Sequence, residues 1–323
     1  MRVLIYIEIK DNRATFPSLE LISAAKELGG NADTILFGDE LEQAAQDAER
    51  AGATAVYLVR KPGPLSEEYL VQALANLAEN YDLFLFSAGR LGKSLVPQLA
   101  GKIGAGAVND VVKLSVSDGK FVALKPAYAG RLLQSVALQT PKAVVSIRGG
   151  SYEREEAAAG SCAETNALIP EELELDVEYS QRTKILEQVV EAGSGPDLKE
   201  AKIIVSGGLG MGSKENYEKL CGGLAEVLGA ALGATRAAVN KAWIGHSHQV
   251  GQTGNIVKPE LYIACGLSGA VQHQAGMKES KYILAINRDE DAEIFDIANL
   301  GIVGDVNEII PILIEEIKKK KGF

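Results

Sequence analysis

Apolar runs alternate with amphipathic segments of helical period through residues 1–103 of the chain. In the amphipathic segments apolar residues return every three or four positions, whereas the runs between them are continuously apolar, as in buried strands. Such alternation predicts a parallel sheet with helices on both faces. The expected strands are 3–7, 33–37, 55–59 and 81–87, and the expected helices are 18–28, one capped by Asp39 with Glu42 completing a capping box, 66–79 and 92–103.

The rhythm changes near residue 104, where extended runs follow one another with little helix between them. We expect them to be added, mostly antiparallel strands that complete the same first sheet. These runs are 108–116, 120–125, 132–138 and 142–146, and residues 171–179 predict one further strand at a domain margin.

Two domains are expected, because 323 residues exceed the usual size of one hydrophobic core and a hydrophobic content of 46% suffices for two. Residues 191–197, Glu-Ala-Gly-Ser-Gly-Pro-Asp, have the composition of a linker. We therefore place the boundary near 190–198, with an N-terminal α/β domain over residues 1–192 and a second domain over 198–323.

Strand and helix patterns alternate again after this linker. The expected strands are 202–206, 237–239, 261–265, 282–286 and 301–303, separated by helices at 213–228 and 268–276 and a turn at 294–299, with a last helix at 306–320. This order predicts a flavodoxin-like or Rossmann-like doubly wound domain, whose ligand binds beyond the carboxyl ends of the strands. Glycine or short polar residues follow the expected strands: Gly207 and Gly208, Asn240, Gly266 to Ser268, Asn287, and Asp305.

The charge balance bears on partners and on the compartment. A net charge of −10 disfavours nucleic acid as a partner, because its recognition needs clustered positive charge. The basic run 318–321 ends the last helix and is explained as a solvated complement to the helix dipole. Cys162, Cys221 and Cys265 have neither disulfide nor metal spacing, which favours a reducing compartment. With no signal or membrane segment before strand 3–7, we expect a cytoplasmic protein without membrane insertion.

Two glycine-rich segments imitate phosphate-binding loops. Residues 207–212 follow an expected strand and open an expected helix, where free backbone N–H groups bind phosphate. They do not spell the G-x-G-x-x-G fingerprint, and Asn240 stands where an NAD site has an acid, so an NAD site is disfavoured. A turn needed only for tight packing is the alternative. Residues 89–94 resemble a P-loop, but Ser87 occupies the position of its first glycine.

Three polar side chains near the expected rim each have two interpretations. Arg236 is either a surface salt-bridge partner or the permanent cation for an anionic ligand. His273 is either a satisfied, half-buried histidine or a side chain that points toward the ligand. Asp305 opens a D-x-x-E capping pattern with Glu308 and also stands where a carboxylate would accept a ribose hydroxyl.

Other kinds of chemistry find little support in the sequence. The spacing of His246, His248 and His273 does not predict a zinc site. Neither a Ser-His-Asp order nor paired catalytic carboxylates emerge, so a hydrolase or transferase is not supported. These features indicate a binding cleft in which a cofactor supplies the chemistry.

Residues 250–277 strongly resemble the signature of the electron transfer flavoprotein alpha subunit. They read Val-Gly-Gln-Thr-Gly-Asn-Ile-Val-Lys-Pro-Glu-Leu-Tyr-Ile-Ala-Cys-Gly-Leu-Ser-Gly-Ala-Val-Gln-His-Gln-Ala-Gly-Met. Residues 285–289, Ala-Ile-Asn-Arg-Asp, and 301–305, Gly-Ile-Val-Gly-Asp, are similar to the same family. The likeness extends to residues 101–112 and 125–131, so it covers most of the chain.

The resemblance implies FAD bound in the second domain, with the flavin ring at the interface with a separate beta subunit. The first domain would serve as a scaffold for binding that partner. By position, Arg236 would lie beside the ring and His273 near its pyrimidine side, where both would stabilise the reduced, anionic forms. Thr253 would offer its hydroxyl toward N5, with Gln252 in the same loop.

The other half of the cofactor is assigned in the same way. Ser268 to Gln272 would supply helix N-terminal contacts to the pyrophosphate, and Asn287 and Asp305 would hold the adenosine half. The FAD-binding residues that the resemblance implies are Thr235, Arg236, Val250, Gly251, Gln252, Thr253, Gly254, Ser268, Gly269, Ala270, Val271, Gln272, His273, Asn287, Asp305 and Val306.

The sequence departs from the common family pattern at three positions. Leu209 stands where many members have arginine, Thr235 where serine is usual, and Asn240 where aspartate is common. Leu209 puts one polar contact near the flavin in doubt. Such departures suit an anaerobic subfamily that bifurcates electrons from NADH to ferredoxin or flavodoxin, with a second FAD in the beta subunit.

The expected function is therefore that of a redox carrier subunit, which has oxidoreductase activity only within a complex. It would exchange electrons with acyl-CoA dehydrogenase-type flavoenzymes through a tightly bound FAD. The alternative is a non-redox regulatory module that binds AMP or ATP at the same rim. An NAD-dependent dehydrogenase lacks both the fingerprint and an acid–base pair.

Overall fold

The computed structural model describes residues 1–128, 130, 132–153, 169–179, 182–183, 185–186, 196–199 and 201–321. The chain divides into two compact units, Met1–Gln188 (unit 1) and Val189–Phe323 (unit 2). Residues 191–195 of the expected linker lie outside the described residues, so the boundary near 190–198 stays a prediction.

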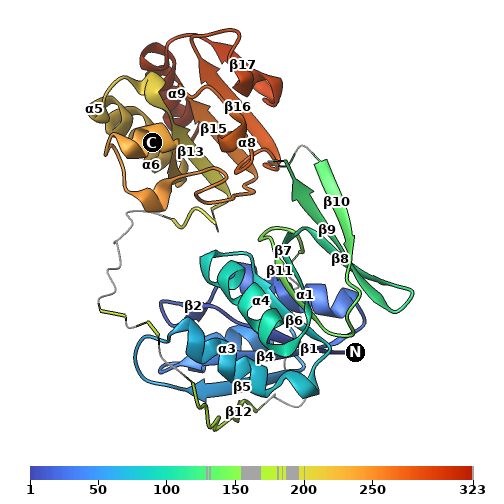
Figure 1. The fold of residues 1–323 in the computed structure, drawn as a ribbon. Helices are drawn as coiled ribbons and strands as arrows, with labels where there is room; N and C mark the ends of the chain where they lie inside the picture. The colour runs from blue at the N-terminus through green and yellow to red at the C-terminus, as the bar shows by residue number, and fades with distance from the viewer. Residues whose placement is uncertain are drawn as a thin grey trace. The chain divides into compact units, whose positions relative to one another are not determined.

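Unit 1 is built on a seven-stranded parallel sheet with the order β12-β5-β4-β1-β6-β11-β7 (Figure 1). The central strands carry unbroken apolar runs, as expected of strands that helices cover on both faces. The strands of this sheet are β1 (Arg2–Tyr6), β4 (Asn31–Gly38), β5 (Ala55–Arg60), β6 (Leu83–Ser87), β7 (Gly106–Val111), β11 (Ala143–Ile147) and β12 (Glu171–Glu172), and β2 (Ile9–Lys10) and β3 (Arg13–Ala14) form a separate hairpin.

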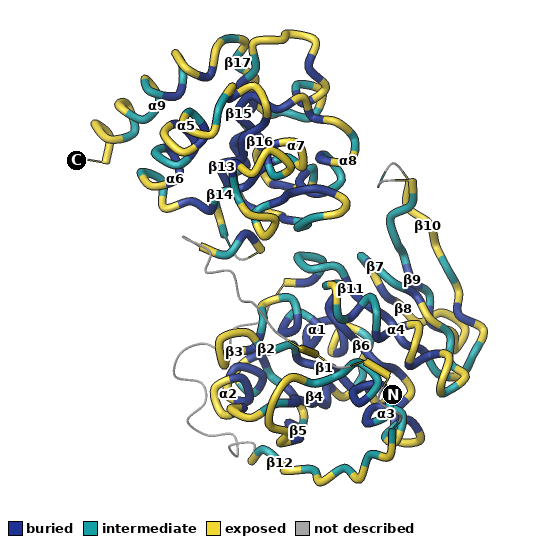
Figure 2. The backbone as a smooth tube through the Cα atoms, turned by 60° about the vertical axis from the view of Figure 1, so that its left-hand side comes forward, coloured by how far each residue is buried: buried dark blue, intermediate teal, exposed yellow. Residues whose placement is uncertain are grey.

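Helices cover this sheet on both sides, so unit 1 has two apolar cores. Alternate residues of β1 enter different cores: Ile5 belongs to the same core as Leu21, whereas Leu4 belongs to the same core as Leu95. Figure 2 shows the central strands as continuously buried backbone. The helices are α1 (Phe16–Glu27), α2 (Glu42–Arg50), α3 (Glu67–Asn76) and α4 (Arg90–Ile103), with a short 3-10 helix at Ala78–Asn80. The predicted fold class of this half is confirmed.

The expected cap of α2 is wrong. The helix begins at Glu42 after Leu41, and no side chain caps it. Asp39 instead accepts a hydrogen bond at its carbonyl oxygen from Nη1 of Arg60, while Nη2 of Arg60 donates to the Glu42 carboxylate. The Glu42 side chain is drawn to this arginine and to the Leu41 N–H, so it does not reach back to Asp39.

The extended runs after residue 104 do not all complete the first sheet, contrary to expectation. β7 and β11 join it in parallel, whereas β8 (Lys113–Ser117), β9 (Lys120–Ala127) and β10 (Leu132–Ala137) form a separate antiparallel sheet. The single strand expected at 108–116 is broken after Val111, and Asp110 just before this break has φ 66. Of the strand expected at 171–179, only β12 forms.

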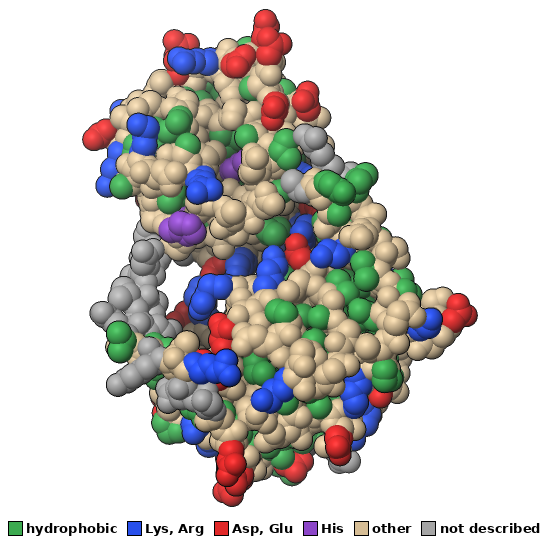
Figure 3. Space-filling view, in the orientation of Figure 1, with side chains coloured by type: hydrophobic (Ala, Val, Ile, Leu, Met, Phe, Trp, Pro, Cys, Tyr) green, Lys and Arg blue, Asp and Glu red, His purple; other side chains and the backbone are tan. Residues whose placement is uncertain are grey.

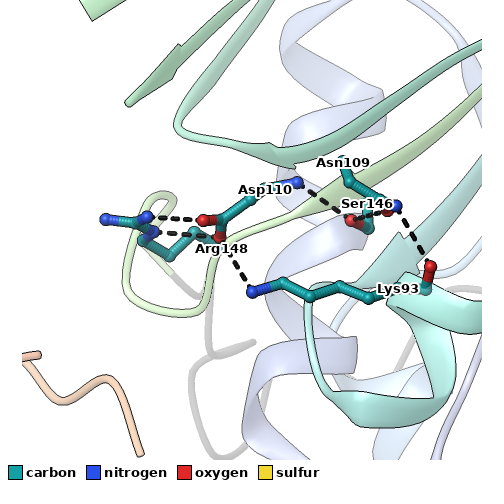
Figure 4. A network of polar contacts seen from close by, with 5 residues as sticks. All are labelled: Lys93, Asn109, Asp110, Ser146 and Arg148. Carbon is teal, nitrogen blue, oxygen red and sulfur yellow. Dashed lines mark hydrogen bonds and ion pairs between the residues drawn. The ribbon is translucent and has the colours of Figure 1, made fainter. Parts of the chain in front are cut away.

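A polar network holds the broken end of β7 against β11 and α4 (Figure 4). Nη2 of Arg148 lies 2.6 Å from Oδ2 of Asp110, and Nζ of Lys93 lies 3.6 Å from Oδ1. The Ser146 hydroxyl donates to Asn109 and accepts from the Asp110 N–H. Both cations of this network are therefore paired with the Asp110 carboxylate.

The antiparallel sheet of unit 1 ends in exposed apolar side chains. Tyr128, Leu132 and Leu133 are 77%, 58% and 61% exposed. In Figure 3 hydrophobic side chains gather beside the grey atoms near the end of β9 and β10. Apolar side chains grouped on one exposed tip are a common feature of protein–protein contact surfaces.

Unit 2 is a five-stranded parallel sheet with the order β14-β13-β15-β16-β17. Numbered along the chain this order is 2-1-3-4-5, which is the flavodoxin-like arrangement and agrees with the predicted fold class. The strands are β13 (Ile203–Gly207), β14 (Ala231–Ala234), β15 (Leu261–Cys265), β16 (Tyr282–Asn287) and β17 (Leu300–Val303).

The faces of the unit 2 sheet are covered in different ways. Val205 and Ile263 pack against helices through Leu224 and Ile310, whereas Ile204 and Tyr262 lie beneath a long loop after β14. The helices are α5 (Lys214–Asn216), a π-helix at Tyr217–Gly222, α6 (Gly223–Leu228), α7 (Arg236–Asn240), α8 (Val271–Gln274) and α9 (Val306–Lys321), with 3-10 turns at Leu209–Met211, His246–His248 and Glu293–Asp296. No helix in the described part of the chain has the length and apolar character needed to cross a membrane.

The strand expected at 237–239 is wrong. These residues belong to α7, and the second strand of the sheet is β14, at residues 231–234. Thr235 ends the strand, and its hydroxyl accepts a hydrogen bond from the N–H of Ala238, as an N-cap does. Asn240 therefore closes a helix, while Thr235 and Arg236 directly follow a strand.

Candidate cofactor-binding site

The centre of the candidate site is the place where the strand order of unit 2 reverses, between β13 and β15. Beyond the ends of these strands, Gly210 donates its N–H to the carbonyl oxygen of Gly266 at 2.8 Å. A Cβ atom on Gly208 or Gly210 would lie 2.5 or 2.6 Å from that oxygen, so only glycine fits. Ligands of doubly wound sheets bind at this switch point, and the bare glycine backbone lets one approach closely.

Thr235 and Arg236 lie at the same edge, because β14 is the neighbour of β13. The Thr235 N–H donates to the carbonyl of Gly207, the last residue of β13. Arg236 is exposed and forms no ion pair with any residue that the structure describes. Its guanidinium is therefore free for an anionic ligand, in contrast to Arg148 in unit 1.

The loop 250–254 is fixed to two parts of this edge. Val250 donates its N–H to Ala234 at the end of β14, and Gln252 donates its N–H to Gln272 at 2.7 Å. Gly251 has φ 143, and a Cβ there would lie 2.8 Å from the Gln272 oxygen. Gln252 and Thr253 are exposed, and the Thr253 hydroxyl accepts a hydrogen bond from Gln249. The loop thus presents two polar side chains on a rigid base.

The segment after β15 is a glycine turn and not the first turn of a helix. The helix expected to start at Ser268 begins at Val271 and has four residues. The Ser268 carbonyl accepts from Ile294, and Gly269 has φ 79 and leaves no room for a Cβ beside the Ile294 backbone. Ser268, Ala270 and Gln272 are exposed, so their contact with a pyrophosphate stays a prediction with a weaker helix dipole behind it.

Asn287 ends β16, and Asp305 follows two residues after the end of β17. Asn287 donates from Nδ2 to the Leu267 carbonyl at 2.9 Å and accepts from the Asp289 N–H, so it braces the turn after β15. Asp305 accepts from the Asn307 N–H at 2.8 Å and from its side-chain amide, and these bonds hold the pKa of Asp305 below its usual value. The capping role of Asp305 is confirmed, and Val306 beside it is buried. A contact with ribose stays a prediction.

His273 lies beneath the loop and not at the surface. It is 7% exposed, and its Nε2 lies 2.9 Å from the Tyr262 hydroxyl oxygen. Burial lowers the pKa of His273 to about 4, so the imidazole is neutral at physiological pH. The ring is buried more deeply than the half-buried histidine of the one interpretation, its Nδ1 has no partner among the described residues, and it is not a cation at the rim. Its contact with a flavin stays a prediction.

Tyr262 and Ser206 are polar groups of this region that the sequence analysis overlooked. Both lie fully buried in central strands of unit 2, on the side of the loop 250–254. The signal for Tyr262 was available, because a tyrosine hydroxyl inside a buried apolar strand needs a hydrogen-bond partner. The partner itself, on α8, was not readable from the spacing.

The described residues contain no group of three or more His, Cys, Asp or Glu side chains placed to hold a metal ion. At the switch point these residues place the glycine backbone of the turn after β13 against that of the turn after β15, and the Arg236 guanidinium has no ion-pair partner among them. They also offer exposed amide and hydroxyl groups, and the buried His273 imidazole, whose Nδ1 has no partner among the described residues. A flavodoxin-like domain with these groups at one edge defines the class of proteins that bind a nucleotide cofactor, and the groups fit FAD.

Comparison with known proteins gives the family. Residues 197–278 match the electron transfer flavoprotein FAD-binding domain, and residues 3–171 match the electron transfer flavoprotein domain. The electron transfer flavoprotein subunit alpha of Bacillus subtilis is 37% identical over 325 residues, covering 98% of each chain. The protein of the same name from Thermoanaerobacterium thermosaccharolyticum is 37% identical over 99% of this chain and 98% of its own, and Protein FixB of Clostridium saccharobutylicum is 37% identical over 98% and 96%.

The chain belongs to the electron transfer flavoprotein alpha-subunit family, and its second unit contains the FAD-binding domain of that family. The resemblance found in the sequence and the assignment of FAD as cofactor are thereby confirmed.

Proposed function

We propose that the chain carries electrons as the FAD-binding subunit of a complex with a beta subunit. The observation that carries this proposal is the exposed Arg236, which has no ion-pair partner among the described residues and directly follows β14, next to the β13–β15 switch point. A permanent cation there stabilises negative charge, which a flavin gains on reduction. FAD, when bound, supplies the chemistry that accepts and donates electrons.

The residues of unit 2 divide the work of holding the cofactor. Arg236, capped into place by Thr235, lies at the flavin end with Gln252 and Thr253 of the loop, whose backbone includes Val250, Gly251 and Gly254. The turn 268–272, in which Ser268, Ala270 and Gln272 are exposed, faces the pyrophosphate through its N–H groups and polar side chains. Asn287, Asp305 and Val306 lie at the ends of β16 and β17, on the side proposed for the adenosine half.

Unit 1 is proposed as the scaffold that binds the beta subunit. Its exposed apolar tip at Tyr128, Leu132 and Leu133 supports a contact with another chain. We further propose acyl-CoA dehydrogenase-type flavoenzymes as redox partners, in the cytoplasm. The departures at Leu209, Thr235 and Asn240 support a complex that bifurcates electrons from NADH to ferredoxin or flavodoxin.

The test is the visible absorption spectrum of the chain purified with its beta subunit. We expect a flavin band that disappears on reduction and returns on oxidation. The substitution Arg236→Ala removes a charge-assisted contact, so the two-electron midpoint potential of the flavin should fall by roughly 30–60 mV. Arg236→Lys keeps the positive charge, so the potential should stay close to that of the wild type.

A colourless complex that takes up no FAD would contradict the proposal. Such a complex with tightly bound AMP or ATP would favour the non-redox regulatory module, which shares the rim but has no visible band. An unchanged potential in Arg236→Ala would remove this arginine from the flavin environment.

A further inference from the structure

A pair of buried polar side chains lies directly beneath the loop 250–254. Tyr262 is fully buried in β15, where its register partners are Ile204 and Ile283, and His273 reaches it from α8. The Tyr262 hydroxyl oxygen and Nε2 of His273 are 2.9 Å apart. Two polar groups placed together in an apolar core need a reason, because each costs free energy to bury.

The surroundings of the pair keep the imidazole neutral. The core around Tyr262 consists of apolar side chains such as Ile204, Val257 and Met277, and no acidic side chain forms an ion pair with His273 among the described residues. Burial lowers the pKa of His273 and raises the pKa of Tyr262. A neutral imidazole has one donor and one acceptor nitrogen, so the tautomer decides what the ring can do.

The neighbours of the ring select one tautomer. The Val250 carbonyl lies near the ring and favours a proton on it, and Nδ1 is the nitrogen that Tyr262 leaves open. Nδ1 completes no hydrogen bond with the described residues, but a bare lone pair facing a carbonyl oxygen is repulsive, whereas an N–H is attracted. Ser206 is fully buried, and its hydroxyl has no hydrogen-bond partner among the described residues, so Nε2 of His273 is the one acceptor that they offer to the phenol hydrogen of Tyr262.

We propose that Tyr262 is a positioning residue: its hydroxyl donates to Nε2 of His273, fixes the tautomer with the proton on Nδ1, and directs this N–H to the Val250 end of the flavin loop. Val250 continues through Gly251 into Gln252 and Thr253, the exposed residues of that loop. In this arrangement the pair supports the Val250 end of the loop. This inference rests on the proposed FAD site, because the loop 250–254 that the pair supports is part of that site.

The tautomer is measured by nuclear magnetic resonance on the complex with ¹⁵N-histidine in this chain alone, which has three histidines. His273→Gln assigns the signal. We expect a neutral His273 protonated on Nδ1 from pH 5.5 to 8.5. In Tyr262→Phe the signal should move toward a mixture of tautomers, and FAD should bind about tenfold more weakly, since Nε2 loses its buried partner.

Tyr217→Phe is the matched control. Tyr217 is also a buried tyrosine of unit 2, but its hydroxyl donates to the Gly233 carbonyl and not to a histidine. It should leave the His273 signal unchanged and change FAD affinity less than twofold. A general loss of packing would affect both variants alike.

A wild-type His273 that is charged at pH 7 or protonated on Nε2 would overturn the inference, and so would an unchanged signal in Tyr262→Phe. If that variant does not fold, the wild-type tautomer decides the matter alone. A wild-type complex without flavin but with the expected tautomer would contradict the proposed function and not the pairing, so the two failures are distinguishable.

Discussion

Charged residues at the carboxyl ends of the two sheets are used in different ways. In unit 1, Arg148 and Lys93 are both directed at Asp110, whereas in unit 2 Arg236 has no ion-pair partner among the described residues. A paired charge stabilises the fold and has little left to offer a ligand, while an unpaired one is available for binding. This contrast supports a ligand site in unit 2.

Asp110 allows the structural role to be tested. Burial alone raises the pKa of Asp110, but the hydrogen bonds and charge of Arg148 and the charge of Lys93 outweigh it and hold this pKa below its usual value. Asp110→Asn keeps the shape and tolerates the left-handed φ of 66, so it removes mainly the charge. We expect a loss of about 2 kcal/mol in the free energy of unfolding at pH 7.

The pH dependence has a definite sign. A carboxylate whose pKa is lower in the folded state stabilises the protein above its unfolded pKa, near 3.9, and loses this effect as the pH falls through the folded value. The difference between wild type and Asp110→Asn in urea denaturation should therefore shrink below about pH 4. Asp118→Asn is the control, because Asp118 is exposed, has φ 50, and has no ion pair among the residues described. Equal losses in both variants would refute a role for the charge.

At the scale of elements, the sequence predicted the long apolar strands well and the short ones poorly. Residues 261–265 were placed correctly, since a continuous apolar run between polar segments leaves little choice. β14 was missed because its sequence, Ala-Leu-Gly-Ala, has low strand propensity, and the helix α7 was mistaken for a strand. Thr235 was the available signal, as a threonine that precedes a helix is a common N-cap.

Contacts between residues far apart in the sequence cannot be predicted from the spacing of residue types along the chain. The family signature and the glycines brought most of the candidate site to one edge of the sheet. The sequence did not reveal that the Asn287 side chain donates a hydrogen bond to Leu267, or that His273 pairs with Tyr262 in the core. Such pairings depend on how α8 and β16 pack, and packing is decided by the whole domain and not by local periodicity.

The turns after β13 and β15 cross at Gly210 and Gly266, so one added methyl group there should lower both stability and FAD affinity. In Gly210→Ala the new Cβ would lie 2.6 Å from the Gly266 oxygen, a backbone atom that cannot move aside alone. We expect a loss of about 1–3 kcal/mol in the free energy of unfolding, together with weaker FAD binding, because the turns after β13 and β15 are forced apart.

Gly222→Ala is the matched control for this variant. Gly222 is helical, and nothing lies within 4 Å of a Cβ built there. Alanine should leave FAD affinity unchanged and raise stability by roughly 0.4–1 kcal/mol. If thermal denaturation and FAD titration show that the two variants behave alike, the crossing does not constrain the site.

The whole chain combines two α/β units with different tasks. Unit 1 has a seven-stranded sheet, an added antiparallel sheet with an exposed apolar tip, and two cations that are paired with one carboxylate at the sheet edge. Unit 2 has a smaller sheet whose edge presents glycine backbone, amides, hydroxyls and a guanidinium that no described residue pairs with. This division supports a binding scaffold joined to a redox cofactor domain.

The central claim is that FAD occupies the edge of unit 2 at the β13–β15 switch point. Amide hydrogen exchange, followed by mass spectrometry on the complex with and without FAD, tests it most directly. We predict slower exchange with FAD in the segments 208–212, 235–236, 250–254 and 266–273 of this chain, and little change at 106–111 and 143–148 in unit 1. Protection confined to unit 1 or to the beta subunit, with none in those four segments, would contradict the account.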